Sequence, residues 1–400
     1  MNILKKIYCR VFQTVFRIAL PLLPYRDPVQ LEKISDIVKI AGEKNLSCPL
    51  IVTDRSIRQL GLIKPLEEEL AKNNYKYAVY DKTEQNPTTH MVMEALSHYK
   101  SHNCDFLIAF GGGSPMDCAK AVGACVARPK TDLKKMAGIL KVIRRTPTIV
   151  AVPTTAGTGS ETTLASVIVD SKTRLKYVIN DFPLIPSYAV LDSSVVHTLP
   201  QNIAAATGMD ALTHAIEAYI GRSTTKGTRA DAEKSVKLIF ENIEKSSSHE
   251  SANAEKAMLL ASHLAGRAFT RSYVGYIHAV SHSLSGKYNM PHGLTNAILL
   301  PIVLEMYGSS VYKKLAKLAR ISNIGKPDAD DSELAKDFIK EIYALNRRLG
   351  IPDYIDGIKK EDIETLSNHA DKEANPLYPV PILWDKDELK RIYRRAGKIQ

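Results

Sequence analysis

The chain has 400 residues, of which 44% are hydrophobic and 24% charged, and 54 basic against 43 acidic residues give a net charge of +11 at pH 7. This composition can bury a sizeable core, which excludes a disordered chain and a small disulfide scaffold, and the length predicts about two domains. The basic excess is spread along the chain, and no basic block is interleaved with aromatic residues, so we do not expect nucleic-acid binding. The five cysteines lack the spacing of a zinc ribbon, a CxxC pair or a disulfide framework, which favours a reducing cytoplasm.

Residues 1–27 form a basic and apolar extension. Arg17 interrupts the apolar stretch and no cleavage site follows, so we expect neither a signal peptide nor a bilayer span. Apolar residues recur at helical spacing, and the basic residues lie largely off that stripe: Ile3, Ile7, Val11 and Val15 against Lys5, Lys6, Arg10 and Arg17. We predict a short amphipathic helix that packs on the protein itself or on a second subunit, with association with a membrane surface as the less favoured alternative.

Residues 28–198 alternate helical patterns with short apolar runs, which is typical of a parallel sheet covered by helices. The predicted strands are 49–54, 76–81, 106–110, 148–152 and 188–192. Between the last two strands, β-rich segments on either side of Asp170 predict a hairpin within 166–179. From residue 199 to 400 the strand signals stop, and an all-helical domain is predicted from long helical patterns that include 201–220, 230–246, 252–268 and 332–349.

A strand, three glycines and the start of a helix follow one another in residues 106–120, FLIAFGGGSPMDCAK. Glycines let the backbone approach an anion, and the N–H groups and positive dipole end of the helix favour a pyrophosphate. The full GxGxxG pattern is absent, because Met116 stands where the third glycine is required. The loop predicts a phosphate site, with a glycine turn that binds no ligand as the alternative.

A second polar loop, VPTTAGTGSETT at 152–163, directly follows another predicted strand. Its hydroxyl groups suit ribose and phosphate oxygens, and they belong to Thr154, Thr155, Thr158, Ser160 and Thr162. Asp54 ends the first predicted strand, where a carboxylate can accept both ribose hydroxyls of NAD and repel the 2′-phosphate of NADP. The alternative, which the local sequence favours, is that Asp54 caps a helix beginning near Ser56.

Two pairs of possible metal ligands stand four residues apart in helical patterns: Asp210 with His214, and His278 with His282. Side chains at this spacing project from one face of a helix, so each pair is pre-aligned. His292 follows after a glycine-containing stretch. One carboxylate with two or three imidazoles predicts a divalent-metal site, with iron(II) and zinc as the leading metals. Glu217 lies on the same helix face as the first pair, and we expect it to support a ligand rather than bind the metal.

Four motifs, GGGSPMDCAK, PTTAGTGSETT, GMDALTHAIEAY and HAVSHSLSGKYNMPHG, together resemble the iron-containing (group III) alcohol dehydrogenase family in their order and approximate spacing. The resemblance implies an α/β, Rossmann-like NAD-binding domain, an all-α metal-binding catalytic domain and a cleft between them, in a dehydroquinate synthase-like architecture. It also implies a homodimer.

The same resemblance assigns the site residues. The metal ligands would be Asp210, His214, His278 and His292, while His282 would lie beside the metal and relay protons. The pyrophosphate would be held by Gly111, Gly112, Gly113, Ser114 and Asp117. The cofactor would be lined by Thr154, Thr155, Thr158, Ser160 and Lys176, and Asp54 would indicate NAD(H) rather than NADP(H).

The chain departs from the family pattern near the expected substrate channel. Thr270, Arg271 and Tyr273 stand where many members carry small or amide residues, which implies a narrower and more polar channel. The segment NPLYPVP at 375–381 replaces a commoner Asn-Pro-Arg ending.

The expected activity is hydride transfer between a small primary alcohol or diol and NAD, with the metal polarising the substrate oxygen. Three alternatives stay open on the sequence: a zinc polyol dehydrogenase of the glycerol type, a metal-dependent phosphohydrolase and a non-catalytic binding protein.

Overall fold

The computed structural model describes residues 1–173 and 175–399. The chain forms two compact units, an α/β unit at Pro24–Leu199 and a helical unit made of Met1–Leu23 and the residues from Pro200 onward. The first unit ends next to the predicted boundary at residue 198. The N-terminal extension belongs to the helical unit, although the α/β residues follow it in the sequence.

The α/β unit is built on a six-stranded sheet with the order β1-β9-β6-β4-β2-β3. The strands are β1 (Val29–Leu31), β2 (Pro49–Val52), β3 (Ala78–Tyr80), β4 (Phe106–Gly111), β6 (Thr148–Pro153) and β9 (Tyr188–Val190). Every pairing between them is parallel, which confirms the predicted sheet. The edge strand β1 was not predicted, because its three residues are mostly exposed and carry no long apolar run.

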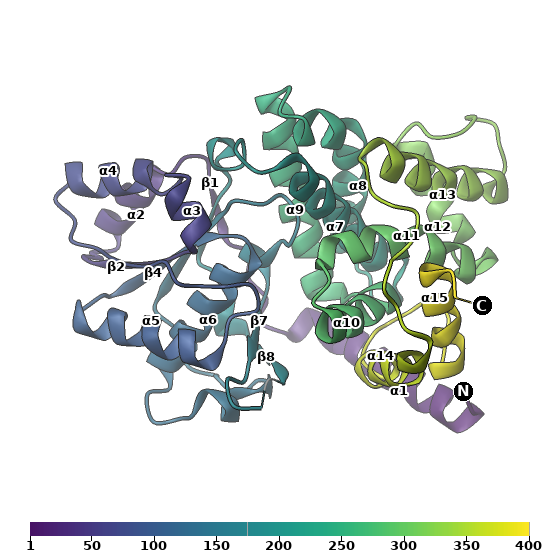
Figure 1. The fold of residues 1–400 in the computed structure, drawn as a ribbon, viewed down its shortest axis with the longest axis horizontal. Helices are drawn as coiled ribbons and strands as arrows, with labels where there is room; N and C mark the ends of the chain where they lie inside the picture. The colour runs from purple at the N-terminus through teal and green to yellow at the C-terminus, as the bar shows by residue number, and fades with distance from the viewer. Residues whose placement is uncertain (174, 400) are drawn as a thin grey trace. The chain divides into compact units, whose positions relative to one another are not determined.

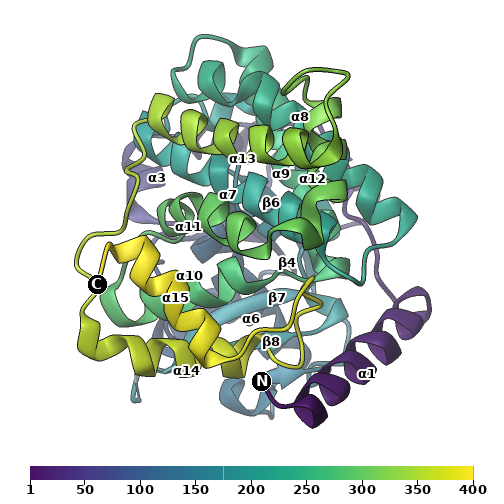
Figure 2. The same ribbon diagram turned by 90° about the vertical axis from the view of Figure 1, so that its right-hand side faces the viewer.

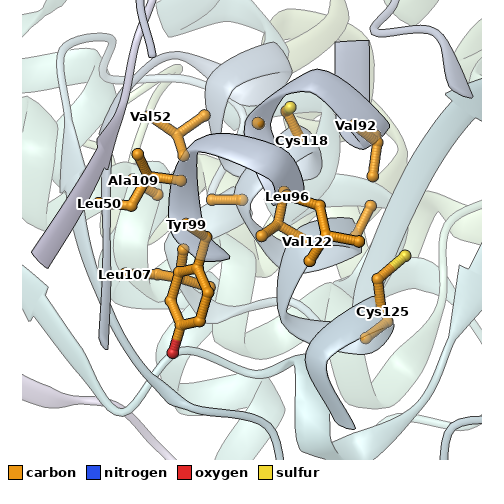
Figure 3. Packing of buried hydrophobic residues seen from close by; sticks show 14 of the residues in the cluster. Leu50, Val52, Val92, Leu96, Tyr99, Leu107, Ala109, Cys118, Val122 and Cys125 are labelled. Atoms are coloured by element: carbon orange, nitrogen blue, oxygen red, sulfur yellow. The ribbon is translucent and has the colours of Figure 1, made fainter. Parts of the chain in front are cut away.

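Helices cover both faces of this sheet. Figure 1 shows α2 (Asp36–Glu43), α3 (Arg55–Gln59) and α4 (Lys64–Lys72) on one side, with α5 (Thr89–Ser101) and α6 (Gly113–Ala127) on the other. In Figure 3, Leu50 and Leu107 of the strands pack against Leu96 of α5 and Val122 of α6. Because both faces are covered, β2 and β4 are buried at every position, which explains their unbroken apolar sequences.

A second, three-stranded sheet has the order β5-β8-β7, from β5 (Gly138–Ile139), β7 (Ala165–Val169) and β8 (Lys176–Asn180). Strands β7 and β8 pair antiparallel, which confirms the predicted hairpin around Asp170. Short 3-10 helices complete this unit at Leu133–Met136, Ser160–Thr162, Phe182–Leu184 and Ser193–Val195.

The helical unit contains no strand among the residues described from 200 onward. Its helices are α1 (Ile3–Ala19), α7 (Gln201–Ile220), α8 (Lys226–Ser247), α9 (Ala252–Ser272), α10 (Tyr276–Tyr288), α11 (His292–Tyr307), α12 (Ser309–Ile321), α13 (Asp331–Arg348), α14 (Ile363–Ala374) and α15 (Lys386–Gly397), with 3-10 turns at Leu20–Leu22 and Lys360–Asp362. Helix α7 is buried from Gly208 to Ile220, so its second half lies in the core of the unit.

Helix α1 is confirmed, and it packs on this chain through the side opposite its apolar stripe, so the stripe itself stays open to a second subunit or a membrane surface. The stripe of Ile3, Ile7, Val11 and Val15 is more than half exposed at every position, and the helix instead buries Cys9 and Gln13. The packed side of α1 makes both polar and aromatic contacts, because Arg10 and Gln13 donate to backbone carbonyls and Phe16 packs on the Tyr273 ring. Among the described residues, no helix is both long and apolar enough to cross a membrane.

Candidate metal centre and nucleotide loops

The predicted metal ligands meet in the interior of the helical unit. Asp210 and His214 of α7 and His278 of α10 are buried, and one ligand atom from each lies within 4.8 Å of the others. Nε2 of His278 lies 3.9 Å from Oδ1 of Asp210. Nε2 of His292, at the start of α11, lies 3.7 Å from the same oxygen. The structure therefore gathers all four residues, and two of them share a helix face because of their i, i+4 spacing.

A side chain that the sequence pattern did not indicate lies among these ligands. The Asn296 amide nitrogen lies 2.7 Å from Oδ1 of Asp210, 3.2 Å from Nε2 of His278 and 3.1 Å from Nε2 of His292. Asn296 is fully buried on α11, four residues after His292. Its N–H groups thus point to the same lone pairs that a cation would use, so the donor set fits a divalent metal.

Glu217 fixes the proton on His278. One carboxylate oxygen lies 2.6 Å from Nδ1 of His278 and accepts the N–H of Gly275, while the other accepts the N–H of Ile277. Burial raises the pKa of Glu217 to about 7, against the effect of these hydrogen bonds. Burial, reinforced by His214, His292 and His282, also holds the pKa of His278 well below its usual value. A neutral His278 with its proton on Nδ1 leaves Nε2 as a ligand, as metal-binding histidines require.

Gly275 makes the Glu217 contact sterically feasible. A Cβ atom at this position would lie only 2.6 Å from Oε1 of Glu217. The residue is the N-cap of α10, the helix that carries His278. Only a glycine therefore lets the start of α10 pack this closely on the buried carboxylate.

His282 lies at the edge of the cluster. Its ring stacks on His292 with centroids 5.0 Å apart, and its Nδ1 lies 2.6 Å from a carboxylate oxygen of Glu373. The hydroxyl of Tyr378 donates to the same oxygen. Burial raises the pKa of Glu373, but His282 and Tyr378 outweigh it and hold that pKa below its usual range. Nothing in the spacing pointed to Glu373, which is 91 residues away in sequence.

The first nucleotide loop forms as predicted between β4 and α6. Gly111 has a φ of +153°, and a Cβ atom there would lie 2.6 Å from the Pro115 side chain. Gly112 is the N-cap of α6 and receives no side-chain cap, so the first N–H groups of the helix stay available to an anion. Helix α6 begins at Gly113, and Ser114 lies in its first turn.

The second loop lies directly against the first. A Cβ atom on Gly112 would lie 3.5 Å from the methyl group of Thr155, and one on Gly113 would lie 3.5 Å from the methyl group of Thr158. Thr154 continues the sheet, since its N–H donates to the carbonyl of Gly111. The two loops predicted to bind one cofactor are therefore adjacent at the carboxyl ends of β4 and β6.

Lys120 ties these loops together, and no motif in the sequence singled it out. Its fully buried ammonium group donates to the carbonyls of Ser160, Thr163 and Ala165 and to the hydroxyl of Thr163. Burial lowers the pKa of Lys120 and raises that of Asp117, and the attraction between the two charges opposes both shifts. Lys120 was detectable as a lysine within an otherwise apolar helix, AKAVGACVA.

The remaining cofactor candidates lie at the rim of the α/β unit. Asp54 caps α3, since its carboxylate accepts the N–H of Ile57 at 2.9 Å, as the alternative interpretation expected. Its side chain is half-buried just after β2. Lys176 begins β8, where burial lowers the pKa of its ammonium group and the Asp117 carboxylate opposes that shift.

The residues that depart from the family pattern lie between α9 and α10. Thr270 and Arg271 are in the last turn of α9, and Tyr273 follows with a φ of +61°, which is unusual for a bulky side chain. The Tyr273 ring packs on Phe16 of α1 and on Tyr378. The extension and the 375–381 segment thus both contact a residue that was expected to line the channel.

Two family descriptions match almost the whole chain. Residues 27–193 match "Iron-containing alcohol dehydrogenase", and residues 204–397 match "Fe-containing alcohol dehydrogenase family, C-terminal". The chain belongs to the iron-containing alcohol dehydrogenase family. Both units of this dehydrogenase are therefore family elements, and α1 lies outside the matched residues.

Named relatives agree with this family assignment. The chain is 34% identical to 1,3-propanediol dehydrogenase of Citrobacter freundii, over 96% of this chain and 99% of the relative. It is 35% identical to lactaldehyde reductase of Escherichia coli (strain K12), over 84% of this chain and 88% of the relative. These similarities make the chain an oxidoreductase that acts on alcohols or aldehydes.

Solved structures share the fold over nearly the full length. The crystal structure of a 1,3-propanediol oxidoreductase has a TM-score of 0.89 at 33% identity, covering 93% of this chain and 99% of that chain. A sulfoacetaldehyde reductase from Bifidobacterium kashiwanohense, solved in complex with NAD+, has a TM-score of 0.83 at 25% identity and covers 94% of this chain and 99% of that chain.

Proposed function

We propose that this dehydrogenase interconverts a small primary alcohol or diol and its aldehyde, with NAD(H) as the hydride carrier and divalent iron at the metal centre. The observation that carries the proposal is the buried cluster in which the ligand atoms of Asp210, His214 and His278 lie within 4.8 Å of one another. His292 would complete the ligand set from the start of α11.

When bound, the metal would act as a Lewis acid that polarises the substrate oxygen. The chain prepares its side of this chemistry in advance. Glu217 keeps the His278 proton on Nδ1, and Ser281 lies 3.0 Å from Nδ1 of His292, so both imidazoles direct Nε2 at Asp210. Burial of Asp210, His214 and His278 keeps water from their side of the site, which strengthens the charge interactions there.

His282 would move the proton that the alcohol releases. Its Nδ1 lies 2.6 Å from Glu373, so a carboxylate stands beside the ring that would carry the proton. The His282 side chain is 44% exposed, so that proton can pass on to solvent. The role of Glu373 is to orient and stabilise the protonated ring.

The two adjacent loops of the α/β unit would bind the dinucleotide. The uncapped N–H groups at the start of α6 would face the pyrophosphate, beside Asp117 and the hydroxyls of Thr155 and Thr158. Complex formation with NAD+ by the sulfoacetaldehyde reductase relative supports this cofactor. NADP(H) is the less favoured alternative, because the Asp54 carboxylate would repel a 2′-phosphate.

The names of the relatives support a short, polar substrate such as a three-carbon diol or a hydroxyaldehyde. Thr270 and Arg271 would supply polar groups for a second oxygen of such a substrate. Zinc in place of iron, with a polyol as substrate, is the nearest alternative within this chemistry.

We also propose a homodimer that works in a reducing cytoplasm. The five cysteines are all buried thiols, and even Cys48 and Cys104, whose sulfurs lie 3.7 Å apart, are free. This pattern is typical of a chain that does not rely on disulfides.

The test is His278→Ala, compared with His369→Ala, which changes an exposed histidine of α14. Purified, anaerobically iron-loaded proteins would be assayed against an alcohol and aldehyde panel with NADH and NADPH in parallel, and their metal content measured. We expect His278→Ala to lose bound metal and at least about 10³-fold in turnover, and the control to keep both. Full metal content and turnover in His278→Ala would refute the proposed centre, and phosphate release without NADH consumption would favour the phosphohydrolase.

A further inference from the structure

Helix α1 presents a continuous apolar face to solvent. The exposed side chains on this face are Ile3, Leu4, Ile7, Tyr8, Val11, Phe12, Val15 and Ile18. Their spacing of three and four residues places them on one side of the 17-residue helix, which is about 25 Å long. Figure 2 shows α1 in dark purple at the periphery of the helical unit. Contiguous exposed apolar surface of this kind marks an interaction site.

Specific contacts hold α1 in this orientation. The Arg10 guanidinium donates to the carbonyls of Val380 at 2.8 Å and Pro381 at 2.9 Å. The Gln13 amide donates to the carbonyl of Tyr378 at 2.7 Å, and it is one of the buried polar side chains of the unit. The helix is therefore anchored to the chain through its polar side. Because these contacts fix its orientation, its apolar side faces solvent.

The charged side chains of α1 itself are all basic, and Lys5, on the other edge of the apolar face, is paired with Asp371. Residues 1–26 contain no acidic residue. Lys6, Arg10 and Arg17 fall in one row along an edge of the face, because positions four and seven residues apart lie close together on a helix. Lys6 and Arg17 are exposed. An apolar face with tyrosine and phenylalanine among its residues and a basic edge matches an anionic lipid surface.

A second copy of the chain is a poorer match for this face. Two α1 helices paired antiparallel through it would bring their basic edges together. Since α1 carries no acidic residue, nothing on the partner helix would neutralise Lys6 and Arg17.

We propose that α1 is an interfacial helix that seats this dehydrogenase reversibly on an anionic phospholipid bilayer. The helix would lie in the plane of the interface with its apolar side chains at the boundary between headgroups and acyl chains. Arg10 and Gln13 would keep their contacts with residues 378–381 in the bound state, so binding requires no unfolding of the helical unit. This role is separate from the proposed reaction.

The test is sedimentation of the full-length protein with vesicles of phosphatidylcholine, alone or mixed with phosphatidylglycerol. Ile7→Ser/Val11→Ser removes two side chains that are 55% and 56% exposed on the apolar face. The matched control is Leu60→Ser/Met93→Ser, which removes side chains that are 57% and 52% exposed on the α/β unit. Circular dichroism and turnover of each variant would show that the fold is kept.

We expect the wild type and the control to sediment with the anionic vesicles and to be released by high salt, because basic residues supply part of the attraction. The α1 variant should bind at least about tenfold more weakly. Absence of wild-type binding to anionic vesicles, or equal binding by the α1 variant, would overturn the proposal. A fall in oligomer mass confined to the α1 variant, without vesicle binding by the wild type, would assign the face to a second copy instead.

Discussion

The metal cluster and the nucleotide loops are both polar sites, but the chain builds them by different means. In the helical unit, Asp210, His214 and His278 lie on α-helices, and the regular helical backbone fixes the positions of their side chains without a ligand. In the α/β unit, the second loop leaves the sheet after Thr154 and contains a single short 3-10 turn at Ser160–Thr162, and a buried lysine holds its carbonyls. Rigid spacing suits a small ion, whereas a tethered loop suits an extended ligand with many oxygens.

Among the changes that test this comparison, replacing Lys120, the buried lysine that holds the second loop, should have the largest effect. Lys120→Met keeps the length of the side chain but leaves three carbonyls and the Asp117 carboxylate without their cation. We expect a loss of about 3 kcal/mol in the free energy of unfolding, because breaking a buried charged network strands its partners. Denaturant titration would measure it against Lys100→Met, an exposed lysine of α5. If Lys120→Met were as stable as the control, the second loop would keep its conformation without the lysine.

A smaller effect is expected at the metal cluster, because the helices already fix the positions of its side chains. Glu217→Gln retains the size of the side chain but removes the charge that faces Nδ1 of His278. Metal affinity should fall by about 10- to 100-fold, as is typical when the partner of a ligating histidine is altered. Competition with a chelator would measure the affinity, and Glu244→Gln, at an exposed position of α8, serves as control. Unchanged affinity would mean that packing alone orients His278.

Asp54 has two possible roles that one substitution separates. Asp54→Ser keeps an oxygen that can cap α3 but removes the carboxylate. If Asp54 selects NAD(H), the ratio of kcat/KM for NADPH over NADH should rise about tenfold with little change in stability. An unchanged ratio would leave Asp54 as a helix cap only.

The smallest effect concerns the hairpin of the α/β unit. The Lys134 ammonium, with the N–H groups of Thr173 and Lys172, holds the pKa of Asp170 below its usual value. Its folded pKa is thus lower than the unfolded value of about 3.9, so the stabilisation is fully present above that pH and is lost as pH falls from it towards the lower folded pKa. The Tm difference between the wild type and Asp170→Asn should therefore be constant near neutral pH and shrink as pH falls below about 4. A difference that is independent of pH would contradict the ion pair.

Much of the fold was predictable because it rests on local patterns. The buried parallel strands appear in the sequence as unbroken apolar runs, and α7 was placed at 201–220 from its composition alone. The i, i+4 pairs also identified the metal candidates. Contacts between distant segments could not be predicted, and these include Glu373 on His282 and Asn296 among the ligands. The side of α1 that packs on the chain could not be predicted for the same reason, since the backbone carbonyls that accept from Arg10 are invisible in a residue pattern.

Gly275 limits how this enzyme can be redesigned. Residues 270–273 are expected near the substrate channel, and the backbone there leads within two residues to the glycine on which the Glu217 carboxylate rests. A library that varies this stretch can therefore explore shape and polarity as far as Val274, the residue before the glycine. Any side chain at position 275 would instead displace the carboxylate and with it the imidazole of His278. Position 275 is therefore closed to any redesign that is to keep His278 in place.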